Sequence, residues 1–165
     1  MPSGSLTTRL WILSNADLKR RAESEMLRPT LLGLLRLHWC HQMSLADTEV
    51  HWHSKHVDLA FMSPREELGA VAIELKVDNT RRAIEQARLN RYLTAQSWAA
   101  VHTPPGPELR ARAERYGVGL LLVLDDGVYP IAWPSARNVQ SSVLADHLAG
   151  RQRRVRDILG ALRRV

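Results

Sequence analysis

The segment from Ala70 to Val77 alternates two kinds of residue, and this alternation constrains the fold more than any other part of the chain. A period of two places alternate residues on opposite faces of a β-strand. One face would carry the branched apolar residues Val71, Ile73, Leu75 and Val77, and the other would carry Ala70, Ala72, Glu74 and Lys76. The first face therefore belongs to a core, while the second brings two charges into an otherwise apolar strand.

A second strand of the same design precedes this one. Within residues 57–61, Val57, Leu59 and Phe61 share one face, and Asp58 shares the other with Ala60. The connecting segment, residues 63–69, contains proline and glycine and is typical of a turn between neighbouring strands. Charged groups in apolar strands are costly unless they pair with each other or bind a metal. We therefore expect the charged side chains of the two strands to lie together.

Asp58, Glu74 and Lys76 are the residue types that metal-assisted phosphodiester hydrolysis requires. Carboxylates are hard oxygen ligands of the kind that Mg²⁺ prefers. The ammonium group of Lys76 can position or deprotonate the attacking water, or hold the phosphate. The alternative interpretation is a salt bridge between Lys76 and one of the two acids on an exposed part of the sheet, which implies no catalysis.

The rest of the chain predicts helices around such a sheet. We expect a helix that begins after a cap at Ser14 and runs to Leu27, because Pro29 disfavours helical geometry in the residue before it. A short second helix would run from Pro29 to Leu37, and a long C-terminal helix would begin near residue 142 and weaken at Gly150. Further strands are predicted over 45–52, 97–102, 120–124 and 128–133, and further helices over 81–95 and 108–116. This order indicates an α/β (or α+β) fold in one domain, 1–165, with a central mixed sheet of about five to six strands flanked by helices.

The order of elements and charges resembles the PD-(D/E)xK nuclease superfamily, the restriction-endonuclease-like proteins, over residues 14–134. The resemblance rests on a first helix with an acid, a strand with Asp58, and a strand that ends in Glu74-x-Lys76. It implies that Asp58, Glu74 and the backbone carbonyl of Leu75 hold a metal ion and that Lys76 is the catalytic lysine. Val57 stands where the superfamily motif has proline, a departure that is frequent among its members.

Two further positions extend the resemblance. Many members carry a glutamine on the helix after the lysine strand, and Gln86 matches it, although a solvent-facing polar residue is the alternative. Many members also place an acid on the first helix, where Glu23 and Glu25 both qualify. We favour Glu25, one turn before the expected helix end. The resemblance thus implies a catalytic set of Asp58, Glu74, Lys76, Gln86 and Glu25, with Mg²⁺ as cofactor and Mn²⁺ as a substitute.

Positive charge is concentrated in the C-terminal segment, residues 141–165. Residues 151–165 hold six arginines and one acid, Asp157, which is +5 of the chain's net charge of +6. Arginines on phosphates release counterions, so this balance suits a polyanion partner such as DNA. The candidates for such contacts are Arg151, Arg153, Arg154 and Arg156. A solvated helix face, or an element that docks on a second copy or on a separate effector protein, is the alternative.

Five histidines lie near the single cysteine, Cys40, and His-x-His spacing can bind zinc. His51 and His53 would share a strand face, but no second well-spaced pair accompanies them, so we favour histidines that line a groove beside the Asp58 strand. The remaining members of this group are His38, His41 and His56. A single cysteine excludes an internal disulfide and fits a reducing, cytoplasmic compartment. The chain shows no secretory signal and no apolar run of the ~18 residues that a membrane span needs.

The sequence therefore predicts a cytoplasmic bacterial nuclease that hydrolyses DNA phosphodiester bonds with Mg²⁺, in defence, repair or mobile-element biology. A Holliday-junction-type resolvase has the same order of acids and lysine. A non-catalytic DNA-binding or scaffold subunit on the same fold is the alternative from another functional class. The sequence leaves open DNA versus RNA, endonuclease versus exonuclease action, specificity and oligomeric state.

Overall fold

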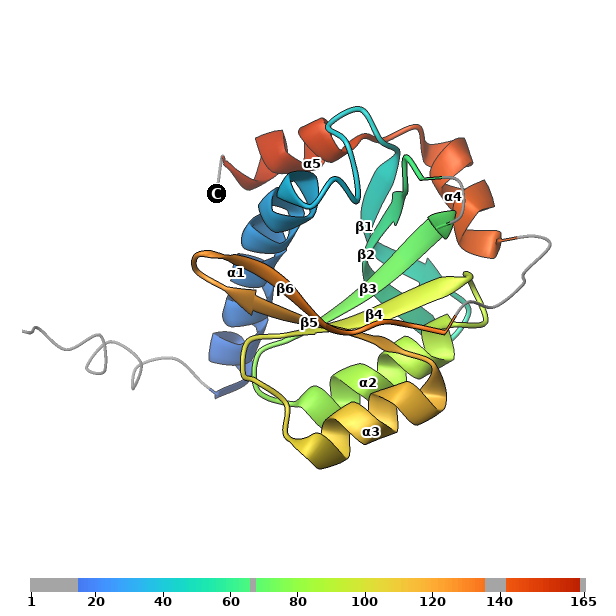
Figure 1. The fold of residues 1–165 in the computed structure, drawn as a ribbon. Helices are drawn as coiled ribbons and strands as arrows, with labels where there is room; N and C mark the ends of the chain where they lie inside the picture. The colour runs from blue at the N-terminus through green and yellow to red at the C-terminus, as the bar shows by residue number, and fades with distance from the viewer. Residues whose placement is uncertain (1–14, 66–67, 136–141, 164–165) are drawn as a thin grey trace, which may run out of the picture.

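A six-stranded mixed sheet organises the chain, and its strands stand side by side in sequence order (Figure 1). The computed structural model describes residues 15–65, 68–135 and 142–163. The neighbouring pairs β3–β4 and β4–β5 are parallel, and the other three pairs are antiparallel. The strands are β1 Ala46–Trp52, β2 Lys55–Met62, β3 Ala70–Lys76, β4 Gln96–Val101, β5 Gly119–Leu124 and β6 Gly127–Ala132. The predicted α/β fold with a mixed sheet flanked by helices is confirmed.

Helices pack on both faces of the sheet (Figure 1). On one face, α1 (Asn15–Arg36) and α5 (Val155–Leu162) share a core with branched and aromatic residues of β2 to β5. On the other face lie α2 (Thr80–Asn90), α3 (Pro107–Tyr116) and α4 (Val143–Arg151). The helices α2 and α3 supply the crossovers that parallel neighbours require. The chain therefore places its β2–β3 hairpin between two helical layers.

The alternation predicted for β2 and β3 is visible in their packing. Leu59, Phe61 and the branched residues of β3 lie in the core shared with α1, whereas Ala60 and Ala72, which pair across the two strands, pack with α4. Val57 is an exception, because it packs in the cluster of Ala60 and Ala72 rather than with Leu59 and Phe61. Beside it, Glu49 of β1 has a left-handed backbone (φ 54°), which marks an irregular point in that strand.

The predicted end of the first helix at Leu27 is wrong. Helix α1 continues through Pro29, and no separate second helix begins there. Proline in a helix interior removes one hydrogen bond at a cost of about 3 kcal/mol. Burial offsets this cost: Leu31 and Leu34 are fully buried, and each such side chain contributes about 1.5–3 kcal/mol. The Thr30 hydroxyl also donates a hydrogen bond of 2.7 Å to the Met26 carbonyl. The expected cap, Ser14, lies outside the described residues.

The predicted single C-terminal helix is also wrong, because the segment forms two helices, α4 and α5. The break does not fall at Gly150, which lies inside α4, but at Gln152, whose left-handed backbone (φ 55°) ends that helix. The following residues run beside the loop before β1: Ala46 N–H donates to the Arg153 carbonyl (2.8 Å), and Val155 N–H donates to the Ser44 carbonyl (3.0 Å). This strand-like pairing interrupts the helix and brings the apolar residues of α5 onto the chain's own core.

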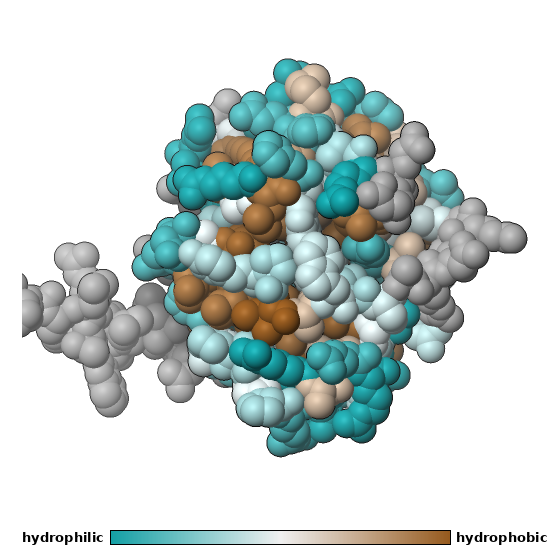
Figure 2. Space-filling model, viewed as in Figure 1, coloured by the Kyte–Doolittle hydropathy of each residue, from teal (hydrophilic) through white to brown (hydrophobic). Residues whose placement is uncertain are grey.

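The surface is mixed. Figure 2 shows hydrophilic side chains at the level of α3 and hydrophobic ones at the level of β5 and β6. Across the ranges that the structure describes, no helix is both long enough and apolar enough to cross a membrane.

Candidate active site

Asp58 and Glu74 lie next to each other on neighbouring strands. The β2–β3 register pairs Leu59 with Ile73, so the next position along it brings Asp58 opposite Glu74. Asp58 is fixed by the strand that it faces, because its Oδ2 accepts a hydrogen bond of 2.7 Å from the Leu75 N–H. The structure thus brings together the two acids that the sequence singled out.

Glu74 is a buried acid with unmet hydrogen-bonding capacity. Its side chain is 0% exposed, and neither carboxylate oxygen has a hydrogen-bond partner among the residues that the structure describes. Lys76 Nζ lies 3.2 Å from Oε1, which is an ion-pair contact outside hydrogen-bonding geometry. Burial, reinforced by the negative charge of Asp58, raises the pKa of Glu74 to about 8, although Lys76 opposes the shift. Buried oxygens without partners are rare in folded proteins and call for an explanation.

Lys76 joins the acids from the end of β3. Its Nζ lies 3.2 Å from Glu74 Oε1, 3.8 Å from Asp58 Oδ2 and 3.4 Å from Glu23 Oε2. Burial alone would lower the pKa of Lys76, but these three acids outweigh burial and raise it. The side chain is only 12% exposed, so these ion pairs lie in a sheltered place and not on an exposed part of the sheet. Nζ also donates a hydrogen bond of 3.0 Å to the carbonyl of Leu75, the atom expected to face a metal.

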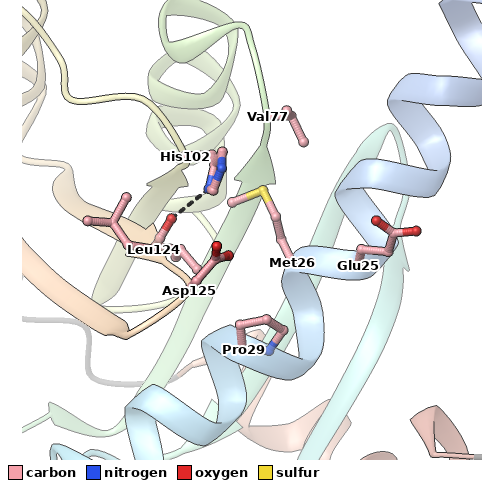
Figure 3. Close-up of a pocket in the computed structure, with 8 residues that line it drawn as sticks. Glu25, Met26, Pro29, Val77, His102, Leu124 and Asp125 are labelled. Atoms are coloured by element: carbon pink, nitrogen blue, oxygen red, sulfur yellow. Dashed lines mark hydrogen bonds between the residues drawn. The ribbon is translucent and has the colours of Figure 1, made fainter. Parts of the chain in front are cut away.

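The first helix contributes Glu23 rather than the favoured Glu25. Glu25 lines a separate pocket of about 270 Å³ on another side of α1, with Pro29, His102 and Asp125 (Figure 3). Residues two apart on a helix differ by roughly 200° in direction, so only one of the two acids can point at Lys76. The preference for Glu25 followed from an expected helix end near Leu27, and that end does not exist.

A cavity of about 460 Å³ opens over the charged cluster. Gln86 of α2 reaches it, and the Gln86 Oε1 atom is buried without a hydrogen-bond partner within the described ranges. Arg82, one turn earlier on the same helix, also lines the cavity and was not among the residues predicted for the site. Its spacing of four residues from Gln86 is the signal that could have found it. The lining also includes Glu23, Ser24, Leu27, Thr48, Glu49, His56, Asp58, Glu74, Leu75 and Lys76.

One histidine of the sequence cluster belongs to this site. His56 Nδ1 lies 3.2 Å from Asp58 Oδ1, and His56 Nε2 lies 2.6 Å from Glu49 Oε2. The spacing His56-x-Asp58 already implied a shared strand face, but the role of Glu49 depends on the β1–β2 register. The expected His-x-His pair does not form, because His53 lies in the turn after β1 with a left-handed backbone (φ 52°). The His51 ring instead contacts His56 across the strands, at 4.6 Å between centroids.

The remaining members of the sequence cluster do not join this site. Cys40 is buried in the core, and burial raises the pKa of its thiol to about 12. Of the described His, Cys, Asp and Glu side chains, two groups could hold a metal ion: His56 with Asp58 and Glu74, and His56 with His51 and Glu49. Neither group includes His38, Cys40 or His41.

The C-terminal arginines are partly engaged within the protein. Arg151 and Arg153 approach the buried Asp47 at 3.5 and 3.2 Å, and His147 Nε2 lies 2.9 Å from the same carboxylate. Arg154 precedes α5 and donates to the Met43 carbonyl. Arg156 and Arg151 are exposed, so these two arginines remain the most accessible members of the predicted nucleic-acid-binding set.

Comparison with known proteins adds a likeness in fold. The sequence matches no known protein family and no curated protein. Among solved structures, the chain is similar to the SPO1766 protein of unknown function from Silicibacter pomeroyi, with a TM-score of 0.51 and 17% sequence identity. The match covers 84% of this chain and 85% of that one. At this identity the likeness concerns the fold alone.

Proposed function

We propose that this chain is a divalent-cation-dependent nuclease that hydrolyses phosphodiester bonds of DNA, with Asp58, Glu74 and Lys76 as its catalytic cluster. The observation that carries the proposal is the Glu74 carboxylate, fully buried with both oxygens lacking hydrogen-bond partners among the described residues. A salt bridge with Lys76 accounts for the charge of Glu74 but leaves its oxygens unsatisfied. A cation between Glu74 and Asp58 would satisfy them.

The donors at this point fit Mg²⁺, or Mn²⁺ in its place, because they are hard oxygen atoms. Asp58 and Glu74 would hold the ion, and the Leu75 carbonyl has a second lone pair besides the one that accepts from Lys76. When bound, such an ion polarises a phosphate and stabilises the charge that builds up in phosphodiester hydrolysis. This assignment rests on the chemistry of the donor set.

Lys76 would act as a charged donor. The nearby acids hold the pKa of Lys76 above its usual value, so its ammonium is protonated at neutral pH in the metal-free site. In this form it would hold a phosphate oxygen or orient the attacking water. Glu23 would position Lys76 from α1 through their contact of 3.4 Å. Gln86, with an unpaired Oε1 at the cavity, is suited to orient a water molecule.

Two features support a polyanionic substrate. The cavity over the acids is open enough, at about 460 Å³, for a phosphate group with its neighbouring sugar atoms, and Arg82 lines it. The chain carries a net charge of +6, and Arg151 and Arg156 are exposed near its C-terminal end. Arginines of this kind contribute salt-dependent affinity for nucleic acid.

The test is incubation of the full chain with supercoiled, linear, single-stranded and branched DNA in Mg²⁺, Mn²⁺ or EDTA. Cleavage is expected with either ion and not in EDTA, and it should disappear in Asp58→Ala and Lys76→Ala. Matched controls are Asp146→Ala, at an exposed position of α4, and Lys55→Ala, at the start of β2, and neither residue lines the cavity.

Equal cleavage by the wild type and Lys76→Ala would overturn the assignment. A preference for four-way junctions over linear duplex would favour the resolvase alternative. Metal-independent binding without cleavage would favour the scaffold alternative.

A further inference from the structure

We propose that His56 is a further protein ligand of the cation, through Nδ1, and that the centre consequently selects a transition ion such as Mn²⁺ over Mg²⁺. This inference rests on the proposed function, because it concerns the same metal centre. The resemblance at the level of sequence implied Asp58, Glu74 and the Leu75 carbonyl but no imidazole. An imidazole nitrogen added to these oxygen ligands changes the class of ion that the centre prefers.

The first observation is the position of His56. It lies two residues before Asp58 on β2, and its Nδ1 lies 3.2 Å from Asp58 Oδ1, so both side chains reach the same site. One ligand atom each from His56, Asp58 and Glu74 lie within 4.8 Å of one another. Glu74, the most buried of the three, has an ion pair with Lys76 but no hydrogen bond to either carboxylate oxygen within the described part of the chain. The group therefore contains a buried carboxylate without a hydrogen bond, a feature that a chance cluster of surface side chains would lack.

The second observation is the contact between His56 and Glu49. His56 Nε2 lies 2.6 Å from Glu49 Oε2, and an ionised carboxylate only accepts hydrogen bonds, so we assign a ring proton to Nε2. Metal-binding histidines typically donate their other ring N–H to a carboxylate in this way, which fixes the tautomer and the ring orientation. The Nδ1 lone pair is then directed toward Asp58. Glu49 would thus be a positioning residue for His56.

The third observation is the distance between Nδ1 and Asp58 Oδ1, which is 3.2 Å. In the tautomer that donates to Glu49, both atoms are acceptors and repel each other unless a positive group lies between them. Adjacent ligands of an octahedral ion with bonds of about 2.1 Å lie roughly 3 Å apart, so the separation suits a shared cation. A doubly protonated ring would also satisfy both carboxylates, and the experiment below separates the two.

The charges around the cavity point the same way. Its lining includes four carboxylates, Glu23, Glu49, Asp58 and Glu74, and two cations, Lys76 and Arg82. With these six groups ionised and the His56 ring neutral, the net charge of the lining is −2, which a divalent ion balances.

The imidazole decides which ion is favoured. Carboxylate and carbonyl oxygens suit both Mg²⁺ and Mn²⁺, whereas an added imidazole nitrogen raises affinity only for first-row transition ions, beginning with Mn²⁺ and increasing toward the later ones. The competing group, His56 with His51 and Glu49, also lies within 4.8 Å, but His51 and Glu49 are exposed, and the group lacks a buried unpartnered atom. We therefore assign the ion to the inner group.

The test uses the full chain, which is first freed of metal with EDTA and then titrated with Mn²⁺. Electron paramagnetic resonance measures the concentration of free Mn²⁺ at each step. Electron spin-echo modulation of the bound ion then reports any directly coordinated nitrogen, and ¹⁵N-labelled histidine identifies it as imidazole without any substitution. Wild type and His51→Gln should both show this nitrogen coupling. His56→Gln should lose it, with Mn²⁺ affinity falling by roughly tenfold or more and Mg²⁺ affinity by less than about threefold.

The outcomes separate the inference from the proposed function. Bound Mn²⁺ without nitrogen coupling would overturn the His56 ligand while leaving the two-carboxylate centre intact. Nitrogen coupling that persists in His56→Gln would identify His51 as a ligand, place the ion in the outer group and also overturn the inference. Nitrogen coupling without DNA cleavage would keep the His56 ligand and contradict the nuclease. Absence of Mn²⁺ binding by the wild type would refute both.

Discussion

Asp58 Oδ2 accepts a hydrogen bond of 2.7 Å from the backbone N–H of Leu75, the residue between Glu74 and Lys76. This bond couples the acid on β2 to the strand that carries the other two charged groups. It leaves Asp58 Oδ1 directed toward His56, at 3.2 Å from Nδ1. The relative placement of the site residues is therefore set by the β2–β3 pairing rather than by a flexible loop.

Asp58→Asn should separate the structural role of this residue from its charge. An amide oxygen can still accept from Leu75 N–H, so we expect the free energy of unfolding to change by less than about 1.5 kcal/mol, the net contribution of one hydrogen bond. Mn²⁺ affinity should nevertheless fall at least tenfold, because a charged oxygen ligand is lost. Thermal unfolding and calorimetric titration of the same sample test both halves. Unchanged ion affinity would contradict the proposed centre.

Glu74→Gln should change the pH dependence of stability in the absence of metal. The pKa of Glu74 is raised from 4.5 to about 8 in the folded protein, so the folded state holds this proton more tightly than the unfolded state. Stability therefore falls as the pH rises from about 4.5 to 8, the window between the two pKa values, and the amide variant lacks this loss. The melting temperature of the variant relative to wild type should increase with pH in EDTA. Parallel melting profiles from pH 5 to 8 would show that Glu74 titrates normally.

Glu23→Gln and Glu25→Gln form a matched pair on α1. Glu23 contacts Lys76 at 3.4 Å, whereas Glu25 lines another pocket. Misplacement of a catalytic group by about 1 Å can reduce the rate by as much as a hundredfold. We expect Glu23→Gln to slow DNA cleavage by roughly ten- to a hundredfold and Glu25→Gln by less than twofold. A larger loss of rate in Glu25→Gln than in Glu23→Gln would instead support Glu25, the acid that the sequence favoured.

Asp47→Asn should destabilise the fold without affecting the site directly. Burial alone would raise the pKa of Asp47, but hydrogen bonds from His147, Thr48 N–H and Arg153 outweigh it and lower the pKa. Because its side chain is only 6% exposed, loss of these charged contacts should cost about 1.5–3 kcal/mol at neutral pH. The lowered pKa contributes stability above 3.8 that disappears as the pH falls below this value. Urea unfolding at pH 7 and pH 3 tests this, with the exposed Asp146→Asn as control.

Arg151→Gln combined with Arg156→Gln should weaken DNA binding without unfolding the chain. Both arginines are exposed, whereas removal of residues 151–165 would also delete the core residues of α5. Each phosphate contact contributes a slope of about −0.9 to the salt dependence of affinity. The slope of the logarithm of affinity against the logarithm of salt concentration should therefore become less negative by about one to two units. An unchanged slope would assign the basic segment to a protein partner.

Much of the site could be predicted because it depends on local alternation. A period of two sufficed to place Asp58, Glu74 and Lys76 on one face of two neighbouring strands, and this inference needs only the geometry of each strand. Gln86 came instead from the resemblance to the nuclease superfamily, and it lines the cavity over these residues.

The misses depended on tertiary packing. Pro29 indicated a helix end, but the burial of Leu31 and Leu34 outweighs the lost hydrogen bond, and this error led to Glu25. The break at Gln152 arises from pairing with the segment before β1, which is more than one hundred residues away in the sequence. The contact between His56 and Glu49 likewise depends on the β1–β2 register, which no local pattern reveals.

The most direct test of the central claim is the rate of plasmid cleavage by wild type, Lys76→Ala and Lys55→Ala in Mg²⁺ and in Mn²⁺. We expect cleavage by the wild type and by Lys55→Ala, abolished by EDTA, and a rate for Lys76→Ala lower by roughly a hundredfold or more, the usual effect of removing a donor that stabilises charge in the transition state. All three proteins should melt in a single transition. Cleavage by Lys76→Ala at the wild-type rate, or by the wild type in EDTA, would contradict the assignment of Asp58, Glu74 and Lys76 as a metal-dependent nuclease centre.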